Sequence, residues 1–308
     1  MTRLINLSDY LKTILSQPTL TSKEIQSMNI TKFMICTCIA VVLGFGLVAV
    51  SDIPASDDAT EKEKASTSNQ PGELYLASDD PMADLATLLE SARRNNKLAL
   101  VVMGANWCHD SRALASRLQQ EPLSSVADEN YETLFVDVGY LEKGKDVITS
   151  LGLPVYYATP TVLIIDPVSG QLINANNRHQ WANAYSISMT DSVEYFQQMA
   201  RLGPASIQSQ KEPGEDLQTL MMEIDAFEQL QADRLYQAYA ILGPMLKAYK
   251  EGEKEAFSDE YWNAVRDFRY QVPADVDSLR AGVRERVAAG EIKISLDYPQ
   301  YQAFPWEQ

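Results

Sequence analysis

One short apolar stretch constrains this chain most, because it is followed closely by a cysteine that opens a helical pattern. Residues 98–103 read LALVVM, and an apolar run of this length predicts a buried strand. Cys108 comes next, and residues 112–118 have helical spacing. A thiol at a helix N-terminus lies beside unpaired backbone N–H groups and the positive end of the helix dipole. This position favours the thiolate, which is the nucleophilic form of cysteine.

Ser111 stands where a redox pair would have its second cysteine. Residues i and i+3 share a helix face, so we expect the Ser111 hydroxyl to donate a hydrogen bond to the Cys108 thiolate. A hydroxyl does not attack sulfur, and a disulfide formed by Cys108 must therefore be broken by an outside thiol. A protonated His109 favours the thiolate, whereas the Asp110 carboxylate disfavours it unless it pairs with His109 or with helix amides. The simpler alternatives are an exposed loop histidine and a helix-capping aspartate.

An uncharged apolar segment at residues 33–50 has the minimum length of a membrane span. Basic residues lie on its N-terminal side, so residues 1–32 are expected in the cytoplasm and the rest outside it. The alternative is a cleaved signal peptide, especially if translation starts at Met28. We therefore expect a single-pass protein of the inner (cytoplasmic) membrane with a periplasmic C-terminal part, or a periplasmic protein released by cleavage.

The net charge and the positions of the cysteines limit which partners and which disulfides this chain can have. The formal net charge is -16, from 26 Lys and Arg against 42 Asp and Glu. Such acidity repels phosphate backbones, so no nucleic-acid partner is expected. Residues 51–72 are polar and acidic, which predicts a flexible linker. Cys36 and Cys38 lie in the apolar segment, so Cys108 is the one thiol of the exported sequence and has no internal disulfide partner.

The remaining patterns predict strands and helices in alternation, followed by a helical region. Expected in order are a short edge strand at 73–76, a helix at 80–94, the strand at 98–103, a helix at 108–120, a strand at 131–138, a helix at 145–151, strands at 161–166 and 171–175 that form a hairpin, and a closing helix at 193–200. From residue 204 to 308 we expect a helical extension packed on this domain, with Gly243-Pro244 interrupting one helix. A separate partner-binding module is the alternative for this region.

This order, with WCHDS at residues 107–111 and Thr-Pro-Thr at residues 159–161, resembles the thioredoxin-like superfamily. The resemblance covers residues 73–203. It implies an α/β fold with a central mixed sheet flanked by helices, here with an N-terminal transmembrane or signal helix and a helical C-terminal extension. It also implies that Pro160 is a cis-proline beside the cysteine. Thioredoxins carry a buried acid where this chain has Val102, so the usual proton acceptor for a resolving cysteine is missing together with that cysteine.

The resemblance implies thiol chemistry of a monothiol kind, either thiol–disulfide exchange or capture of mixed disulfides. The candidate catalytic residues are Cys108, Ser111 and His109, and the candidate substrate-binding residues are Trp107, Asp110, Thr159 and Pro160. Expected partners are protein thiols or disulfides and a small-molecule thiol, besides the membrane through residues 33–50. The alternative function is a non-catalytic protein-binding module of the cell envelope. Neighbouring helix positions do not converge on one ion, and no phosphate loop is present, so neither a metal nor a cofactor is expected.

Overall fold

The computed structural model describes residues 74–175, 177–203 and 214–308, all within one compact unit, Thr67–Gln308. The predicted cytoplasmic segment, apolar segment and linker lie outside the described residues. Of the helices that the structure describes, none combines the length and the apolar character that a membrane span needs.

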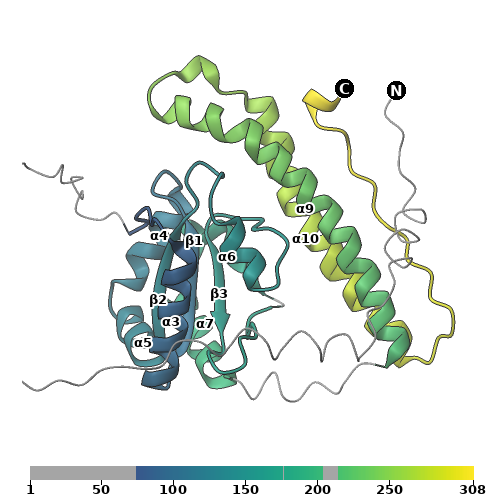
Figure 1. The fold of residues 1–308 in the computed structure, drawn as a ribbon, viewed down its shortest axis with the longest axis horizontal. Helices are drawn as coiled ribbons and strands as arrows, with labels where there is room; N and C mark the ends of the chain where they lie inside the picture. The colour runs from purple at the N-terminus through teal and green to yellow at the C-terminus, as the bar shows by residue number, and fades with distance from the viewer. Residues whose placement is uncertain (1–73, 176, 204–213) are drawn as a thin grey trace, which may run out of the picture. The chain divides into compact units, whose positions relative to one another are not determined.

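Helices and strands follow one another along the chain as Figure 1 shows. They are α3 (Pro81–Asn95), β1 (Leu98–Gly104), α4 (His109–Leu118), α5 (Leu123–Asn130), β2 (Tyr131–Asp137), α6 (Lys145–Ser150), β3 (Thr161–Ile165), the 3-10 segment η1 (Arg178–Ser186), α7 (Met189–Leu202), α9 (Glu215–Lys250), η2 (Lys254–Ala256), α10 (Asp259–Ala288) and η3 (Pro305–Glu307). The predicted α/β order and the helical C-terminal part are both present. The short helix α5 and the segment η1 were not expected from the sequence.

A three-stranded mixed sheet forms the centre of the α/β part, in the order β2-β1-β3. Strand β1 runs parallel to β2, with Val101 opposite Leu134, and antiparallel to β3, with Val101 opposite Leu163. Every residue of β1 is buried. The unbroken apolar run predicted this, because a central strand covered on both faces needs apolar side chains on both.

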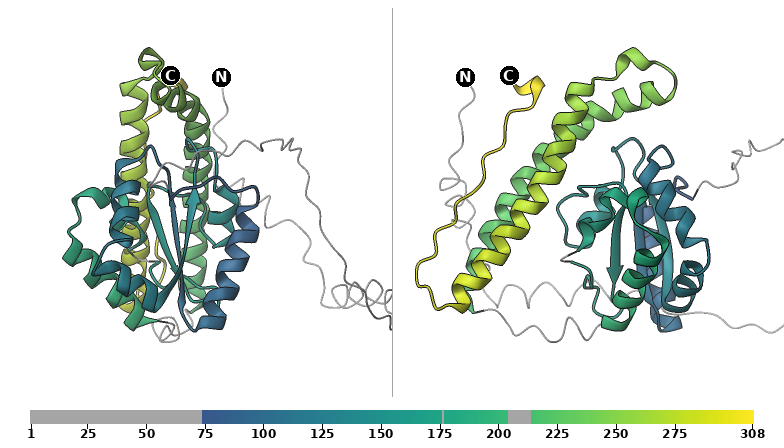
Figure 2. Two further views of the ribbon diagram at one scale, coloured as in Figure 1. Left: turned by 90° about the vertical axis from the view of Figure 1, so that its left-hand side faces the viewer. Right: turned by 180° about the vertical axis from the view of Figure 1, so that it is seen from behind.

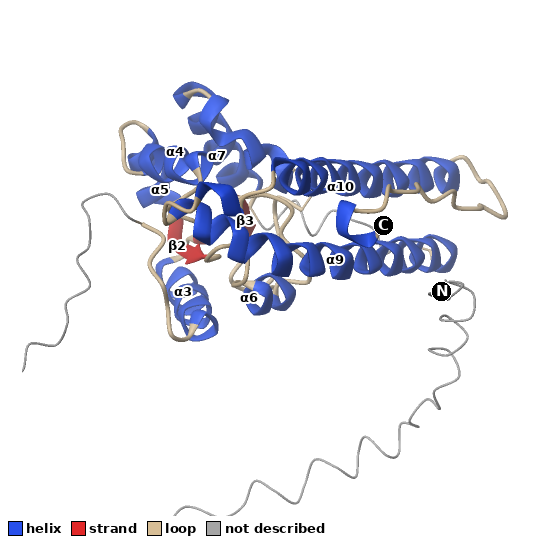
Figure 3. Ribbon diagram, turned by 90° about the horizontal axis from the view of Figure 1, so that it is seen from above, coloured by secondary structure: helices blue, strands red, loops and turns tan. Residues whose placement is uncertain are grey.

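Helices cover the sheet on both faces, and successive side chains of β1 point alternately to the two layers. Ala99 and Met103 pack in one apolar cluster with α3 and α6, whereas Leu100 and Val102 pack in the other with α4, α5 and α7. Figure 3 shows the strands between these helices. The sheet thereby places the end of β1, and the chain that follows it, at one edge of a rigid sandwich.

The predicted edge strand at residues 73–76 is wrong for its described residues, because a side chain takes the place of a strand. The Asn106 amide group donates to the Tyr75 carbonyl (2.8 Å) and accepts from the Tyr75 N–H (3.3 Å). One asparagine thus satisfies both backbone groups that a neighbouring strand would pair with. The sequence could not reveal this pairing, since it joins segments far apart in the chain.

The predicted partner strand at residues 171–175 is reduced to a single bridge between Ile165 and Leu172. An asparagine again replaces the strand. The Asn174 side chain accepts a hydrogen bond from the Ile164 N–H (2.9 Å) and donates one to the Val162 carbonyl (2.8 Å). The chain still turns back antiparallel to β3, with hydrogen bonds from the Asp166 N–H to the Gln171 carbonyl (2.9 Å) and from the Ile173 N–H to the Ile164 carbonyl (2.8 Å). The predicted hairpin is therefore present in short form, and a buried amide pairs with the rest of the edge of β3.

Two long helices, α9 and α10, form an antiparallel helical hairpin, and both views in Figure 2 show them side by side. The predicted interruption at Gly243-Pro244 is wrong, because α9 continues through Pro244, and α10 likewise continues through Pro273. A proline removes one helical hydrogen bond at a cost of about 3 kcal/mol. Burial of an apolar stripe on both sides of Pro244, which includes Leu242 and Leu246, offsets that cost.

The helical hairpin shares its apolar cluster with the face of the sheet that carries Ala99 and Met103. The Tyr239 ring stacks on Tyr156 (centroids 5.4 Å apart), and its hydroxyl donates to the Tyr156 carbonyl (2.8 Å). Burial, partly countered by nearby Arg269, raises the pKa of Tyr239 to about 12. The phenol therefore remains protonated and remains a donor at any physiological pH.

Gly243 allows a close approach between the helical hairpin and the α/β part. A Cβ atom at this position would lie 2.5 Å from the Tyr140 carbonyl oxygen. We expect Gly243→Ala to lower the free energy of unfolding by about 1–3 kcal/mol, because the clash outweighs the gain of about 1 kcal/mol in helix propensity. Urea denaturation of the full chain measures this change.

Gly282→Ala is the matched control for this prediction. Gly282 lies within α10, and a Cβ added there would meet no atom within 4 Å. Alanine at this position should raise the free energy of unfolding by up to about 1 kcal/mol, since only helix propensity changes. Equal effects of the two substitutions would show that the contact with Tyr140 does not matter for stability.

Candidate functional site

Cys108 is the N-cap residue of α4, where the sequence predicts it. Strand β1 ends at Gly104, and a turn closed by the Cys108 N–H on the Ala105 carbonyl (3.1 Å) brings the chain round. The Cys108 carbonyl then accepts the first helical hydrogen bond, from the Arg112 N–H (3.1 Å). No side chain caps this end of α4. The sulfur thus lies at the positive end of the helix dipole.

The Cys108 sulfur contacts the loop that precedes β3. Its thiol donates to the Thr159 carbonyl (3.1 Å), and the Thr159 hydroxyl donates to the sulfur (3.5 Å). The Thr159–Pro160 peptide bond is cis, as the resemblance implies. Cys108 is 8% exposed and is a free thiol. The structure therefore brings together Cys108, Thr159 and Pro160, which are far apart in the chain.

Ser111 does not make the hydrogen bond to Cys108 that its spacing predicts. It is completely buried, and its hydroxyl oxygen makes no hydrogen bond within the described part of the chain. The oxygen occupies space that Gly104 leaves open, since a Cβ atom on Gly104 would lie 2.6 Å from it. The Tyr75 hydroxyl covers the same region and donates to the Ser111 carbonyl (3.1 Å). Burial raises the pKa of Tyr75 far above its ordinary value, so this donor remains protonated.

Asp110 does not cap its own helix. Its carboxylate is buried and accepts a hydrogen bond from the Tyr185 N–H (2.8 Å), which ties α4 to η1. The second carboxylate oxygen lies 3.1 Å from Nε2 of His109, whose side chain is 67% exposed. Of the arrangements that the sequence allows, pairing of Asp110 with His109 is the one observed. The His109 imidazole also packs edge-on against the Tyr185 ring.

Trp107 is fixed by the loop that follows β2. Its indole N–H donates to the Gly139 carbonyl (2.7 Å), and its ring lies parallel to that of Tyr140 (centroids 6.4 Å apart). Gly139 has a positive φ of 57°, a conformation that glycine adopts without strain. This anchoring presents the indole next to the cysteine as a rigid apolar surface.

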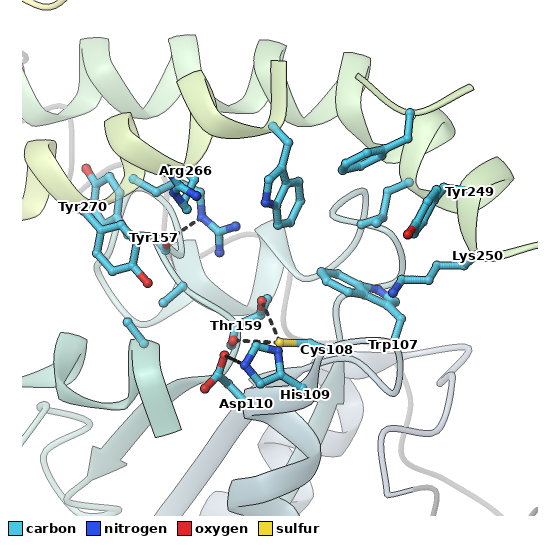
Figure 4. A pocket seen from close by; sticks show the side chains of 16 residues that line it. Trp107, Cys108, His109, Asp110, Tyr157, Thr159, Tyr249, Lys250, Arg266 and Tyr270 are labelled. Carbon is cyan, nitrogen blue, oxygen red and sulfur yellow. Dashed lines mark hydrogen bonds and ion pairs between the residues drawn. The ribbon is translucent and has the colours of Figure 1, made fainter. Parts of the chain in front are cut away.

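Cys108 and some of the residues around it lie at one side of a cavity of about 340 Å³, and the helical hairpin forms the other side. The cavity is lined by Trp107, Cys108, His109, Asp110, Tyr157, Ala158, Thr159, Ala182, Leu246, Tyr249, Lys250, Phe257, Trp262, Arg266, Arg269 and Tyr270. Figure 4 shows Cys108, His109 and Asp110 facing the ends of α9 and α10, which carry Tyr249, Lys250, Arg266 and Tyr270. Pro160 and Ser111 are not among the lining residues.

Sequence reasoning missed the hairpin side of the cavity entirely. A signal was present, because Trp262, Arg266 and Arg269 are spaced at i, i+4 and i+7 and therefore share one helix face. An aromatic and two arginines on one face are unusual for a helix that only packs on a core. The described residues include no group of three His, Cys, Asp or Glu that is arranged to hold a metal ion.

The comparison with protein families agrees with this fold. Residues 80–167 match a family model described as thioredoxin-like. The domain that carries Cys108 therefore belongs to the thioredoxin-like superfamily. Among solved structures, the chain is similar to a disulphide isomerase from Xylella fastidiosa Temecula1, with 25% identity over 42% of this chain and 97% of that chain and a TM-score of 0.39. No curated protein matches the chain.

Proposed function

We propose that this protein performs thiol–disulfide exchange of the monothiol type through Cys108. The observation that carries the proposal is the free thiol at the N-terminus of α4, opening onto a cavity, with Ser111 in place of a resolving cysteine. The Cys108 thiolate attacks one sulfur of a partner disulfide, a new S–S bond forms, and the old one breaks. The departing thiolate takes a proton from water. The mixed disulfide lasts until an external thiol attacks it.

The proposed partners are protein thiols or disulfides, as membership of the thioredoxin-like superfamily suggests, together with a small thiol that releases them. We place the domain outside the cytoplasm, anchored through residues 33–50 in the inner membrane or released into the periplasm after cleavage. The uncharged segment and the basic residues before it support this location. An oxidising compartment also supplies the disulfides that a lone thiol needs as partners. Mass spectrometry of the mature N-terminus distinguishes the anchored form from the cleaved form.

A non-catalytic protein-binding module is the second candidate. It is favoured by the low exposure of Cys108 and by its hydrogen bond to the Thr159 carbonyl, which together keep the sulfur from approaching a large partner directly. In this alternative the cavity and the helical hairpin bind a protein, and the thiol is incidental.

Trapping in cells separates the two candidates. The parent for this experiment is the full chain with Cys36 and Cys38 replaced by alanine. We expect this parent to form adducts that disappear on reduction. The same chain with Cys108→Ser added should form none. Blotting after acid quenching and alkylation measures these adducts. A Cys108 thiol that resists alkylation in the folded protein, reacts only after unfolding and yields no adducts would leave the binding module as the function.

A further inference from the structure

The cavity beside Cys108 has a charge opposite to that of the whole protein. Among the described residues that line it, Lys250, Arg266 and Arg269 are basic and Asp110 is acidic. The whole chain has 42 acidic residues against 26 basic ones. A cleft lined by charges of one sign attracts ions of the opposite sign, so the cations of this cavity should raise the local concentration of anions.

The positive charge in the cavity is not cancelled by nearby carboxylates. In the described ranges, no ion pair joins a carboxylate to Lys250 or to Arg269. Arg266 lies 2.9 Å from Asp267, but both side chains are about half exposed, and such a pair is weak and screened by solvent. The Asp110 carboxylate is already engaged by His109 and by the Tyr185 N–H. The residues that line the cavity therefore present a net positive charge to an anion that enters it.

Aromatic rings accompany these cations. The rings of Tyr249 and Phe257 have centroids 4.9 Å apart, and those of Phe257 and Trp262 are 5.7 Å apart. Together with Trp107 they give the cavity apolar surfaces on both of its sides. A volume of about 340 Å³ is typical of sites for small molecules. The lining thus suits a small ligand that has an apolar body and a negative charge.

The backbone beside Cys108 is poorly prepared to bind an extended polypeptide. A peptide that adds as a strand needs free backbone groups. The Tyr156 carbonyl accepts from the Tyr239 hydroxyl (2.8 Å), and the Tyr157 carbonyl accepts from Nε of Arg269 (2.6 Å). The Thr159 carbonyl accepts from the Cys108 thiol. The helical hairpin thus occupies acceptors that an incoming strand would use.

We propose that the cavity binds a small thiol or disulfide that carries a carboxylate, and that this molecule is the direct exchange partner of Cys108. The proposal rests on the exchange function proposed above. In one direction the Cys108 thiolate attacks the small disulfide, one S–S bond forms as another breaks, and the anionic thiolate leaves. In the reverse direction the thiolate of the small molecule attacks the outer sulfur of the mixed disulfide, so the small disulfide forms again and the Cys108 thiolate leaves. Lys250 and Arg266 hold the carboxylate in both steps.

Two aromatic disulfides of opposite character test this inference. Dithiobis(nitrobenzoate) carries carboxylates, dithiodipyridine carries no charge, and each releases a coloured thiol when Cys108 attacks it. The experiment uses the full chain in detergent with Cys36 and Cys38 replaced by alanine. We expect the double variant Lys250→Gln, Arg266→Gln to react about tenfold more slowly with the anionic disulfide, and within twofold of the parent with the uncharged one. The difference should shrink in high salt.

A matched double variant controls for total charge. Lys247→Gln, Lys254→Gln removes the same two charges from the same hairpin, but neither residue lines the cavity. It should leave both rates within about twofold of the parent, because both charges are exposed to solvent and neither side chain lines the cavity that holds the carboxylate. Far-UV circular dichroism checks that both variants are folded.

The possible results separate the inference from the function beneath it. If the cavity variant and the control slow the anionic disulfide equally, or if neither does, the anion site is wrong while exchange at Cys108 stands. If an acidic peptide that carries the same disulfide reacts faster than dithiobis(nitrobenzoate), the partner is a polypeptide and the small-molecule site is wrong. If the parent chain fails to react even with dithiodipyridine, the proposed function fails, and the inference fails with it.

Discussion

Replacing Ser111 with cysteine is expected to turn a persistent mixed disulfide into a short-lived one. The new thiol would lie one helical turn after Cys108, on the same helix face, where it can attack the mixed disulfide from within the protein. A thiol held at such a position acts at a far higher effective concentration than a dilute external thiol, so the lifetime of the adduct should fall by about 100-fold. Stopped reactions with dithiodipyridine, followed by mass spectrometry, measure that lifetime.

The product of this reaction is an internal disulfide between Cys108 and the introduced thiol, which forms as the small thiol leaves and is recognised by the loss of two hydrogens. Ser116→Cys is the matched control, because Ser116 is an exposed residue of α4 beyond the reach of Cys108. It adds a thiol to the same helix without placing it one turn away. A folded Ser111→Cys variant whose adduct lasts as long as that of the control would show that position 111 does not face the sulfur.

The space around Ser111 makes this a demanding test. The hydroxyl oxygen lies in a buried site formed by Gly104 and the Tyr75 ring, and a larger sulfur atom must either fit there or rotate toward Cys108. Because the site is tightly occupied, rotation relieves crowding and favours the internal disulfide. The same tight packing explains why the side chain at this position is as small as that of serine.

Much of the α/β part could be predicted from the sequence, because its signals are local. The run at 98–103 gives β1, and the Asp80-Pro81 pair starts α3, with the Asp80 carboxylate accepting from the Ala83 N–H (2.9 Å). Local patterns of this kind are sufficient because burial on both faces and N-capping each depend on a few adjacent residues. The thioredoxin-like order of elements follows from them.

Other features depended on contacts that no local pattern records. The amide of Asn106 takes the place of one predicted strand by bonding a residue 31 positions away, and the amide of Asn174 pairs with β3 where a second strand was predicted. The buried indole of Trp181 lies in η1, a polar stretch that gave no helical signal. The cavity was missed for the same reason, because its two sides come from segments that are far apart in the sequence. A residue pattern on one helix predicts a face, but not what that face will meet.

An ion pair between the two helices of the hairpin is linked to the loop beside Cys108 through a hydrogen bond, and breaking this pair is expected to have the largest effect on stability. Arg280 of α10 lies 2.7 Å from Glu228 of α9, which is only 2% exposed. The second oxygen of Glu228 accepts from the Tyr157 hydroxyl (3.3 Å). We expect Arg280→Leu to lower the free energy of unfolding by about 3–5 kcal/mol, because it removes a cation that lies directly against a buried carboxylate and also breaks the contact of Arg280 with Asp225 (2.7 Å). Urea denaturation of the full chain measures the loss.

The charge itself, rather than the lost packing of Arg280, should account for most of this cost. Adding Glu228→Gln to Arg280→Leu removes the buried negative charge and keeps an acceptor for Tyr157, so about 2 kcal/mol should be regained. Arg284→Leu, an exposed position one turn further along α10, should stay within about 0.5 kcal/mol of the parent. An Arg280→Leu variant as stable as the Arg284 control would show that the pair contributes nothing.

Loss of this ion pair should also make the Cys108 thiol more accessible, because Tyr157 lines the cavity and lies two residues before Thr159. Loosening Tyr157 frees the loop whose carbonyl accepts from Cys108, and it removes one of the links between the hairpin side and the sheet side of the cavity. Alkylation of Cys108 under native conditions should therefore become faster in Arg280→Leu and return toward the parent rate when Glu228→Gln is added. If stability fell while the alkylation rate stayed constant, the hairpin would stabilise the fold without controlling access to Cys108.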